Sequence, residues 1–443
     1  MKYSPYPKYK DSGVAWLGKV PEHWEVQRLR FLASYQNSNV DKKNYEGQEQ
    51  VRLCNYTDVY YNEKITDDLN FMLATASESE IETMKLHIDD VIITKDSEDP
   101  SDIGIPAIVS ENLHNVVCGY HLTVIRAANK ATARFIHRAI QSNPSKAQFH
   151  VESPGITRFG LNQDTIGNLW VATPPLNERE LVASLLDSQT ASIDALITKK
   201  TRFIDLLKEK RLALITHAIT KGLNPHVTMK DSRVEWIGEV PEHWEITRNK
   251  VAFFEVDDRN DSDNGELLTV SHLTGITPRS EKNVNMFLAE TLNGYKKCMA
   301  GDLVINTMWA WMGALGVSPI DGLVSPSYNA YRLRNQTICL PRYYDYLCRI
   351  PEHVVYIKAH STGVWESRLR LYPETFLDMR TCFPPVEEQR DIVAFLDRET
   401  VRIDALLAKT QRSIDLLRER RSALITAAVT GKIDIRKTGE KSA

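Results

Sequence analysis

The sequence lacks the features that define several large classes of protein. Its 443 residues include only six cysteines, which are scattered and form no C-x-x-C pair. No stretch approaches the roughly 18 to 20 apolar residues that a membrane-spanning helix needs. The first ten residues, MKYSPYPKYK, have no apolar core and do not match a secretory signal. We therefore expect a cytoplasmic protein that contacts no membrane and whose cysteines are isolated buried thiols.

Motifs for catalysis are missing as well. An amino-methyltransferase holds its flipped base with a loop such as NPPY. The nearest strings here, none of which fits, are Thr173-Pro174-Pro175, Phe383-Pro384-Pro385 and Asn143-Pro144-Ser145. There is no G-x-x-x-x-G-K-[ST] phosphate loop, and no close His, Cys and Asp cluster has metal-ligand spacing. We therefore expect no catalytic residue and no metal site in this chain.

Composition is that of an ordinary globular protein. Charged residues make up 26 % of the chain and hydrophobic residues 42 %, and the length allows about two to four domains. The net charge of −3 creates no strong global field. It neither supports nor excludes a nucleic-acid partner, because phosphate contacts need only a local basic face.

What the sequence does contain is a repeat. Residues 11–24 and 231–244 share ten of fourteen positions and both end in PEHW. Residues 174–220 and 384–430 share 24 of 47 positions. About 150 residues with little matching sequence separate the short block from the long block in each half. A duplicated frame that carries two different inserts indicates a protein that holds two recognition surfaces in a fixed relation.

Each copy of the long block has the period of a coiled-coil helix, because its seam positions, most of them apolar, are spaced alternately four and three residues apart. These positions are Ile193, Ile197, Lys200, Ile204, Leu207, Arg211 and Leu214 in the first copy and Ile403, Leu407, Thr410, Ile414, Leu417, Arg421 and Leu424 in the second. A Pro-Pro pair precedes each copy and a Gly next to a Lys follows it. Each helix should therefore run about 40 residues, or about 60 Å.

Two arrangements fit such helices. Each could pack alone on its own domain, or the two could pair with each other, which we favour because of their length and their common register. If the halves are related by a pseudo-two-fold axis that crosses the helices, the pair is antiparallel. The polar seam positions Lys200, Arg211, Thr410 and Arg421 would then fix the register at a cost in stability.

The two inserts are predicted to share a mixed α and β fold. Strands rich in Val, Ile and Tyr are expected at 51–59, 89–95 and 116–126, and in the same order at 267–275, 301–308 and 323–334. Segments 132–142 and 341–350 are helix-like. Both inserts end in a similar turn-and-strand stretch, at 153–175 and 361–385.

The recurring PEHW histidines, His23 and His243, could suggest catalysis. No nucleophile or carboxylate accompanies them in sequence, so we interpret them as packed or capping histidines in a turn. The tryptophans that recur with them are interpreted as anchors that pack the short block on a helix or a partner: Trp16, Trp24, Trp236 and Trp244.

Four motifs recur in the same order in both halves: the PEHW block, a D-[VL]-[VI]-I strand, an S-x-G…R…L stretch and a PP-[LV]-x-E-[RQ] start to a long helix. Together they resemble the specificity (S) subunit of type I restriction-modification enzymes, over essentially the whole chain. The resemblance implies an α+β protein with two target-recognition domains and an intramolecular antiparallel coiled coil with pseudo-two-fold symmetry. The implied limits are 1–172 and 223–382 for the domains, 173–222 and 383–435 for the spacer helices, and 436–443 for a disordered tail.

The same resemblance implies partners and a non-catalytic role. Each domain would read one half of a split target in double-stranded DNA. The chain would dock two modification subunits, which transfer a methyl group from S-adenosylmethionine to adenine N6. Restriction subunits that use ATP and Mg²⁺ could join them, and the chain itself would bind none of these cofactors.

The DNA contacts are expected at strand ends and the loops that follow them. Arg, Lys, Asn and Gln read base edges in the major groove, and further basic groups hold phosphates. The candidates are Lys95, Arg158, Asn162, Arg279, Asn306, Arg332, Arg368 and Arg370. For any one of them, a solvated or salt-bridged surface residue is the commoner explanation. Trp309 and Trp311 could wedge against DNA, although packing is favoured.

Arg158 and Arg368 occupy the same place in the two repeats. A shared residue cannot explain different sequence preferences, so we expect these two to hold phosphate or support the fold. The half-sites should lie about one turn of DNA, or about 34 Å, apart. A self-sufficient DNA methyltransferase or nuclease, and a coiled-coil scaffold with no DNA role, remain as other hypotheses.

Overall fold

The computed structural model describes residues 3–281, 291–365 and 368–436. The chain divides into two compact units, Met1–Thr201 with Arg412–Ala443, and Arg202–Gln411. Each unit contains a globular α+β part and part of each of two long helices, α6 (Leu176–Lys221) and α11 (Val386–Val429). The limits predicted for the separate domains and helices stay a prediction, and most of the predicted tail, residues 437–443, lies outside the described residues.

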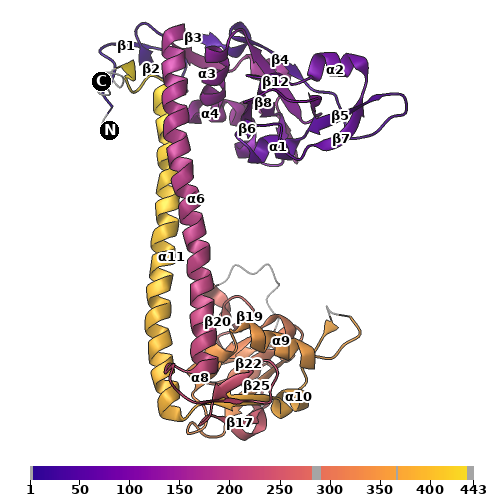
Figure 1. Ribbon diagram of the computed structural model, residues 1–443, viewed down its shortest axis with the longest axis vertical. Helices are drawn as coiled ribbons and strands as arrows, with labels where there is room; N and C mark the ends of the chain where they lie inside the picture. Colours follow the sequence, from indigo (N-terminus) through magenta and orange to yellow (C-terminus); the bar gives the residue numbers. More distant parts are fainter. Residues whose placement is uncertain (1–2, 282–290, 366–367, 437–443) are drawn as a thin grey trace. The chain divides into compact units, whose positions relative to one another are not determined.

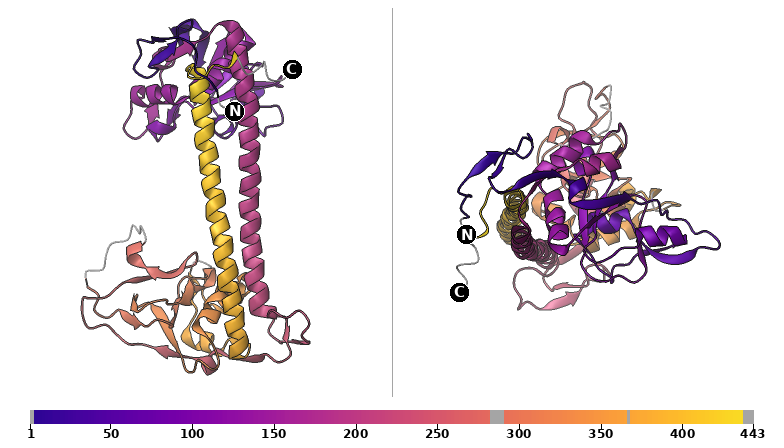
Figure 2. Two further views of the ribbon diagram at one scale, coloured as in Figure 1. Left: turned by 90° about the vertical axis from the view of Figure 1, so that its left-hand side faces the viewer. Right: turned by 90° about the horizontal axis from the view of Figure 1, so that it is seen from above.

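The long helices are those that the 3.5-residue period predicts. α6 has 46 residues and α11 has 44, and in each unit they lie side by side (Figures 1 and 2). They run antiparallel, because the first unit holds the start of α6 and the end of α11. The seam positions Ile193, Leu207, Ile403 and Ile414 are buried, and Ile197, Ile204, Leu407 and Leu417 are half-buried.

Two of the polar seam positions form ion pairs between the helices. In the first unit the Arg421 guanidinium lies 2.9 Å from the Asp194 carboxylate. In the second unit Arg211 lies 3.2 Å from Asp404, and both aspartates belong to the repeated sequence Ile-Asp-Ala-Leu. A shift of either helix would separate these pairs, so they support the role in register that the sequence suggested.

The main sheets of the two units have the same strand order. In the first unit the order is β4 (Ala33–Asn37), β12 (Leu122–Ala127), β8 (Val91–Thr94), β10 (Pro106–Val109) and β6 (Lys64–Ile65). In the second it is β18 (Phe253–Val256), β25 (Tyr328–Leu333), β22 (Leu303–Asn306) and β23 (Leu315–Val317). The first sheet adds an edge strand, β6, parallel to β10. The predicted common fold of the inserts is therefore confirmed.

The central strands β8 and β22 are buried on both faces. Successive side chains of a strand point to opposite faces. Val91 and Ile93 accordingly join one apolar core, which contains helix α3 (Lys130–Ile140), and Ile92 joins a second core. In the second unit, Leu303 and Ile305 likewise join one apolar core and Val304 joins another. The ends of these two strands are thus held rigidly, and the candidate loops follow them directly.

Smaller sheets and helices surround each main sheet. The first unit has β5 (Glu49–Cys54), β7 (Met72–Ala76), β11 (Val116–Cys118), α1 (Tyr56–Tyr61), α2 (Glu78–Met84), α4 (Asn143–Glu152) and α5 (Gln163–Gly167). The second has β19 (Leu268–Ser271), β20 (Gly275–Pro278), β21 (Lys296–Cys298), β24 (Gly322–Val324), α7 (Asn249–Ala252), α8 (Pro341–Leu347), α9 (Pro351–His360) and α10 (Pro373–Asp378).

Four of the predicted strands need correction. The strand predicted over 267–275 ends at Ser271, and the strand predicted over 323–334 is divided into β24 and β25 by a turn, in which the Tyr328 amide donates to the Ser325 carbonyl at 2.9 Å. The strand predicted over 51–59 ends at Cys54, because Asn55 and Asp58 form a capping box that starts α1. The strand predicted over 116–126 is divided into β11 and β12 by a turn, in which the Leu122 amide donates to the Gly119 carbonyl at 3.1 Å. All six cysteines are buried and unpaired. No helix among the described residues is long and apolar enough to cross a membrane.

Candidate nucleic-acid interface

Each PEHW block joins the start of one long helix to the end of the other. In the first unit it follows the hairpin of β1 (Tyr9–Asp11) and β2 (Lys19–Pro21). The buried Trp24 donates its indole N–H to Glu178 in the first turn of α6 at 3.0 Å. Gly431, two residues after the end of α11, packs closely on the PEHW block. A Cβ there would lie 3.3 Å from the Trp24 ring and would overlap Pro21.

The second unit repeats this junction with the roles of the helices exchanged. Its hairpin is β15 (Met229–Asp231) and β16 (Glu239–Pro241). Trp244 donates to Glu388 at the start of α11 at 3.1 Å, and Gly222, at the end of α6, lies against the Trp244 ring. His23 and His243 contact the same glutamates, at 2.8 and 2.7 Å. In this structure these histidines and tryptophans join parts of the frame, while Trp16 remains 41 % exposed.

Each insert starts and ends on a two-stranded sheet beside its PEHW block. β3 (Glu25–Arg28) pairs with β14 (Trp170–Thr173), and β17 (Glu245–Arg248) pairs with β26 (Arg380–Phe383). Both pairings are antiparallel and four residues long. The frame therefore presents each insert through an equivalent base.

Three candidate residues of the first unit lie on one pair of loops. We name residues 95–103, after β8, the first loop A, and residues 153–162 the first loop B. Their short strands β9 (Asp96–Ser97) and β13 (Phe159–Gly160) pair with each other. Arg158 in loop B donates to Asp96 in loop A at 2.8 Å, and His121 contacts the other Asp96 oxygen at 2.8 Å. The Arg158 side chain is still 59 % exposed.

Lys95 and Asn162 flank this contact. The Lys95 ammonium lies 4.4 Å from the centre of the Tyr120 ring, and partial burial lowers the pKa of Lys95. The Leu161 amide donates to the Lys95 carbonyl at 2.6 Å, which ties the two loops together. Asn162 accepts from the Thr165 amide at 2.7 Å and so caps α5. The structure therefore brings Lys95, Arg158 and Asn162 onto one surface.

The second unit has an equivalent pair, which we name the second loop A (residues 306–313) and the second loop B (residues 361–365 and 368–372). The Leu371 amide donates to the Thr307 carbonyl at 3.3 Å, which joins the two loops. Asn306 is buried and accepts from the Met308 amide at 3.3 Å, so its side chain shapes the turn. Arg368 and Arg370 are exposed on the second loop B.

The other candidates of the second unit have different surroundings. Arg332 on β25 makes two hydrogen bonds, at 2.9 and 2.8 Å, to the buried Asp302, which raise the pKa of Arg332. Arg279 opens the short 3-10 helix η3 (Arg279–Glu281) and is half-buried. Trp311 packs beneath Lys358 and donates to the Met308 carbonyl, whereas Trp309 is 49 % exposed. For all eight candidates, DNA contact stays a prediction.

Sequence reasoning missed a cavity of about 350 Å³ beside the first loop pair. It is lined by Tyr56, Tyr60, Asp96, Ser97, Glu98, Asp102, His121 and Arg158. Tyr56 and Tyr60 stack at 5.5 Å, and the Tyr60 hydroxyl donates to Asp102 at 2.5 Å. These tyrosines lie on α1, whose first part, residues 56–59, falls within the strand predicted over 51–59. The Asn55 and Asp58 spacing was the signal that could have identified the helix.

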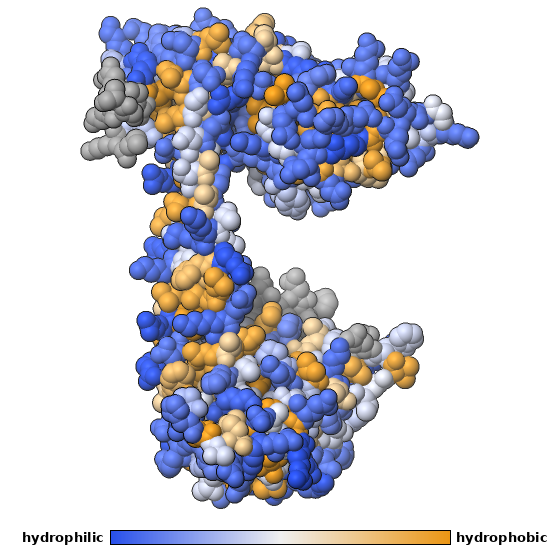
Figure 3. Space-filling model, in the orientation of Figure 1, coloured by the Kyte–Doolittle hydropathy of each residue, from blue (hydrophilic) through white to orange (hydrophobic). Residues whose placement is uncertain are grey.

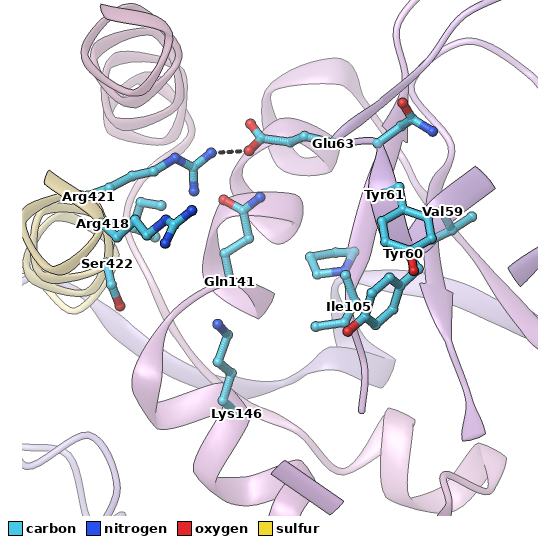
Figure 4. Close-up of a pocket in the computed structure, with 13 residues that line it drawn as sticks. Val59, Tyr60, Tyr61, Glu63, Ile105, Gln141, Lys146, Arg418, Arg421 and Ser422 are labelled. Atoms are coloured by element: carbon cyan, nitrogen blue, oxygen red, sulfur yellow. Dashed lines mark hydrogen bonds and ion pairs between the residues drawn. The ribbon is translucent and has the colours of Figure 1, made fainter. Parts of the chain in front are cut away.

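A second cavity of about 350 Å³ lies between α1, α4 and α11, with Lys146 and Arg418 on its wall (Figure 4). At its side Glu63, just after α1, forms an ion pair with the seam residue Arg421. Glu63 also pairs with Arg138 at 2.6 Å, and Arg138 pairs with Asp187 of α6 at 2.6 Å. Burial alone would raise the pKa of Glu63, but the two arginines hold it below its usual value. The first insert is thereby tied to both long helices.

Comparisons with known proteins agree with this geometry. No protein-family model matches the chain. The putative type I restriction enzyme MjaX specificity subunit of Methanocaldococcus jannaschii is 22 % identical over 435 residues, which cover 95 % of this chain and 96 % of that protein. The MjaVIII specificity subunit of the same organism is 22 % identical over 235 residues, or 52 % of this chain and 49 % of that protein.

Solved structures show the same fold. A chain from a study of complex assembly and conformational transition of the type I R-M system has a TM-score of 0.67 at 16 % identity, and the match covers 94 % of this chain and 99 % of that chain. The HsdS subunit from Thermoanaerobacter tengcongensis has a TM-score of 0.53 at 15 % identity, over 94 % and 98 %.

The fold and the paired loops thus define a protein that carries two inserts of the same fold on a frame of two long helices. More particularly, the chain has the fold of type I specificity subunits, and it resembles the MjaX specificity subunit in sequence over 95 % of its length. The resemblance drawn from its motifs is confirmed.

Proposed function

We propose that this chain is the DNA-recognition subunit of a type I restriction-modification complex, in which each insert reads one half of a split target. One observation carries the proposal. The two inserts share a strand order and a tied loop pair, yet loop A reads DSEDPSD after Lys95 in the first insert and TMWAWMG after Asn306 in the second. Equivalent loops with different side chains are what two readers of different sequences require.

We further propose that two identical modification subunits dock on the repeated frame. Apolar side chains are exposed along the long helices, where Figure 3 shows patches of hydrophobic surface. Leu196 and Leu406 occupy equivalent positions, as do Leu206 and Leu416, and all four are at least 38 % exposed. Equivalent apolar positions on two helices suit two copies of one partner.

The chemistry would then belong to the partners. The modification subunits would hold S-adenosylmethionine and methylate adenine N6, and the restriction subunits would hold ATP and Mg²⁺. The chain would act by selecting the DNA sequence and by positioning those subunits on it. Among the described residues there is no group of three or more His, Cys, Asp or Glu side chains placed to hold a metal ion.

The direct test is to map N6-methyladenine across the genome of a host that expresses the chain with an adenine methyltransferase encoded beside it. We expect one bipartite motif that appears only when both proteins are present. Replacing residues 25–173 by residues 245–383 keeps both sheet junctions and duplicates the second insert. This variant should methylate a target that contains the second half-site twice.

Other outcomes would favour the other hypotheses. Methyl transfer or DNA cleavage by the purified chain alone would make it an enzyme in its own right. Methylation that is independent of the chain, together with no DNA binding by the co-expressed complex, would leave only a scaffold role.

A further inference from the structure

The two loop B segments each carry an apolar side chain that is almost completely exposed. Ile156 is 94 % exposed and Val364 is 92 % exposed. They occupy the same position in the two repeats, directly after the glycine of Ser-Pro-Gly-Ile and Ser-Thr-Gly-Val. Single exposed apolar residues are common on protein surfaces. A β-branched side chain held out to the same extent at the same place in two otherwise different inserts needs a reason.

The backbone of each loop is built to hold that side chain out. A Cβ on Gly155 would overlap the Arg158 carbonyl oxygen, and a Cβ on Gly363 would lie 2.6 Å from the Arg368 carbonyl oxygen. Each loop therefore folds back on itself so tightly that only glycine fits before the exposed residue. In the second loop B, Thr362 and Arg370 also exchange two backbone hydrogen bonds of 2.9 Å.

Each loop B is also fastened to the loop A beside it. The β9 and β13 strands and the Arg158–Asp96 pair do this in the first unit, and the Leu371–Thr307 hydrogen bond does it in the second. Ile156 and Val364, which we call the tips of the two loop B segments, are therefore apolar side chains on loops that are already held in place. Such a side chain loses little conformational entropy when it inserts into a partner.

The surroundings of the tips favour DNA over a protein as that partner. An arginine follows each tip within four residues, as Arg158 and Arg368, and both arginines are exposed. Two of the four acidic side chains of the first loop A are engaged within the fold, since Asp96 contacts Arg158 and His121, and Asp102 accepts from Tyr60. Partner subunits, by contrast, are expected on the repeated helices.

We propose that Ile156 and Val364 are apolar wedges that insert into the DNA at the two half-sites and stabilise a distorted base step. Proteins that kink DNA use isoleucine and similar side chains in this way. Because the tip is the same in both inserts while the loop A sequences differ, the wedge acts independently of the sequence that each insert reads. This inference rests on the proposed function and adds a step to it that both halves share.

The experiment uses the full chain assembled with its modification subunits and a duplex that carries the mapped target. 2-Aminopurine, which fluoresces more strongly when it is unstacked, is placed in one half-site at a time. Ile156→Ser should weaken binding about tenfold and reduce the fluorescence change in the first half-site alone. Val364→Ser should do the same in the second half-site alone. Neither should alter the slope of log affinity against log salt, because the tip neutralises no phosphate.

Matched variants separate this effect from general ones. Leu73→Ser and Val355→Ser remove apolar side chains that are 57 % and 65 % exposed on β7 and α9, and should change nothing. Arg158→Ala should instead reduce the salt slope by about one. If Arg158→Ala leaves both affinity and salt slope unchanged, Arg158 does not hold phosphate.

The wedge is excluded if Ile156→Ser and Val364→Ser bind DNA and unstack 2-aminopurine as the wild type does. It is also excluded if they weaken assembly with the modification subunits but not DNA binding, because the tips would then contact protein. Failure of the wild-type complex to bind the mapped duplex would count against the proposed function itself.

Discussion

Two glutamates hold the helix junctions, and they differ in burial. The Glu178 side chain is 6 % exposed and accepts from Trp24 and from the Tyr6 hydroxyl, both at 3.0 Å. Burial and the neighbouring Glu178 carboxylate raise the pKa of Tyr6 above its usual range, so the hydroxyl remains a donor. The Glu388 side chain is 26 % exposed.

Removal of these carboxylates should therefore have unequal effects. Glu178→Ala leaves the Trp24 and Tyr6 donors buried without an acceptor, and should lower the free energy of unfolding by about 2–4 kcal/mol. Glu388→Ala should lower it by about 1–2 kcal/mol, because water can reach the Trp244 N–H. Urea denaturation of the two variants measures the difference. Equal losses in the free energy of unfolding would contradict the assignment of Glu178 as the more deeply buried of the two glutamates.

A buried histidine in the second unit should make stability depend on pH. Burial lowers the pKa of His353 to about 3, and its ring packs 5.2 Å from the Trp236 ring. The unfolded chain binds a proton near pH 6.5 whereas the folded chain does not, so stability is full above that pH and falls as the pH drops from about 6.5 towards 3. The loss per histidine is about 1.4 kcal/mol per pH unit.

His353→Phe keeps the aromatic packing and removes this titration. Its Nδ1 has no hydrogen-bond partner among the described residues, so the substitution breaks no buried hydrogen bond there. Urea denaturation at pH 7 and pH 5 should show a smaller loss for the variant than for the wild type. His137 in the first unit, with a pKa also lowered to about 3 by burial, should leave a residual dependence in both. Identical pH profiles would show that His353 is not buried in its neutral form.

At the level of single residues, the sequence indicated part of the candidate interface. Lys95, Arg158 and Asn162 were predicted from a strand end and a Gly-rich stretch, and the structure places them on one loop pair. The sequence could not indicate that His121 contacts Asp96 or that Ile156 is exposed, because both depend on how separate segments pack. Arg332 fitted the composition of a DNA contact, but its pairing with the distant Asp302 could not be inferred from local sequence.

At the level of elements, the helices and strands with the longest periodic sequence patterns were predicted most accurately. The 3.5-residue period persists over many turns, so both long helices were predicted with their pairing. The strand predicted over 51–59 was correct up to Cys54 and wrong beyond it. Val and Tyr favour strands, but the hydrogen bonds between Asn55 and Asp58 start α1 there. Short elements are set by such local bonds and by burial, neither of which a periodic pattern contains.

The antiparallel pair should set the distance between the half-sites. The Arg421–Asp194 pair of the first unit and the Arg211–Asp404 pair of the second unit follow the same register, by which residues 199–205 of α6 and residues 410–416 of α11 are matched heptads. Deleting both heptads shortens the pair by about 10 Å and preserves the seam, since seven residues are about two turns. The preferred spacer should become about three base pairs shorter, with both half-site sequences unchanged.

Methylation mapping of the deletion variant measures the spacer directly. Deleting the heptad from α6 alone is the control, because it removes the register and should abolish folding or activity. A folded and active double deletion that keeps the original spacer would refute the role of the helices as a ruler.

For the whole molecule, the two helix junctions differ in how the chain runs through them. In the first unit, residues near the start of the described chain contact residues near its end, whereas in the second unit the chain is continuous. The Asp434 amide donates to the Ser4 carbonyl at 2.7 Å, and the Arg436 guanidinium lies 4.8 Å from the centre of the Tyr6 ring. Residues 222–228 make the equivalent passage in the second unit, from the end of α6 to β15. The repeated frame is therefore closed by contacts at one junction and by a peptide segment at the other.

A circular permutant tests whether the two junctions are equivalent. Joining Arg436 to Tyr3 through a short Gly-Ser linker and opening the chain between Pro225 and Val227 exchanges the covalent junction for the non-covalent one. Because the contacts of both PEHW blocks are kept, we expect the same methylated target and a melting temperature within a few degrees of the wild type. The control opens the same linked chain at Gly155 instead. It should fold but lose the first half-site, since the first loop B is cut. If opening at 225–227 prevents folding while opening at Gly155 does not, the peptide segment of the second unit has a structural role that the contacts at Ser4 and Asp434 cannot replace.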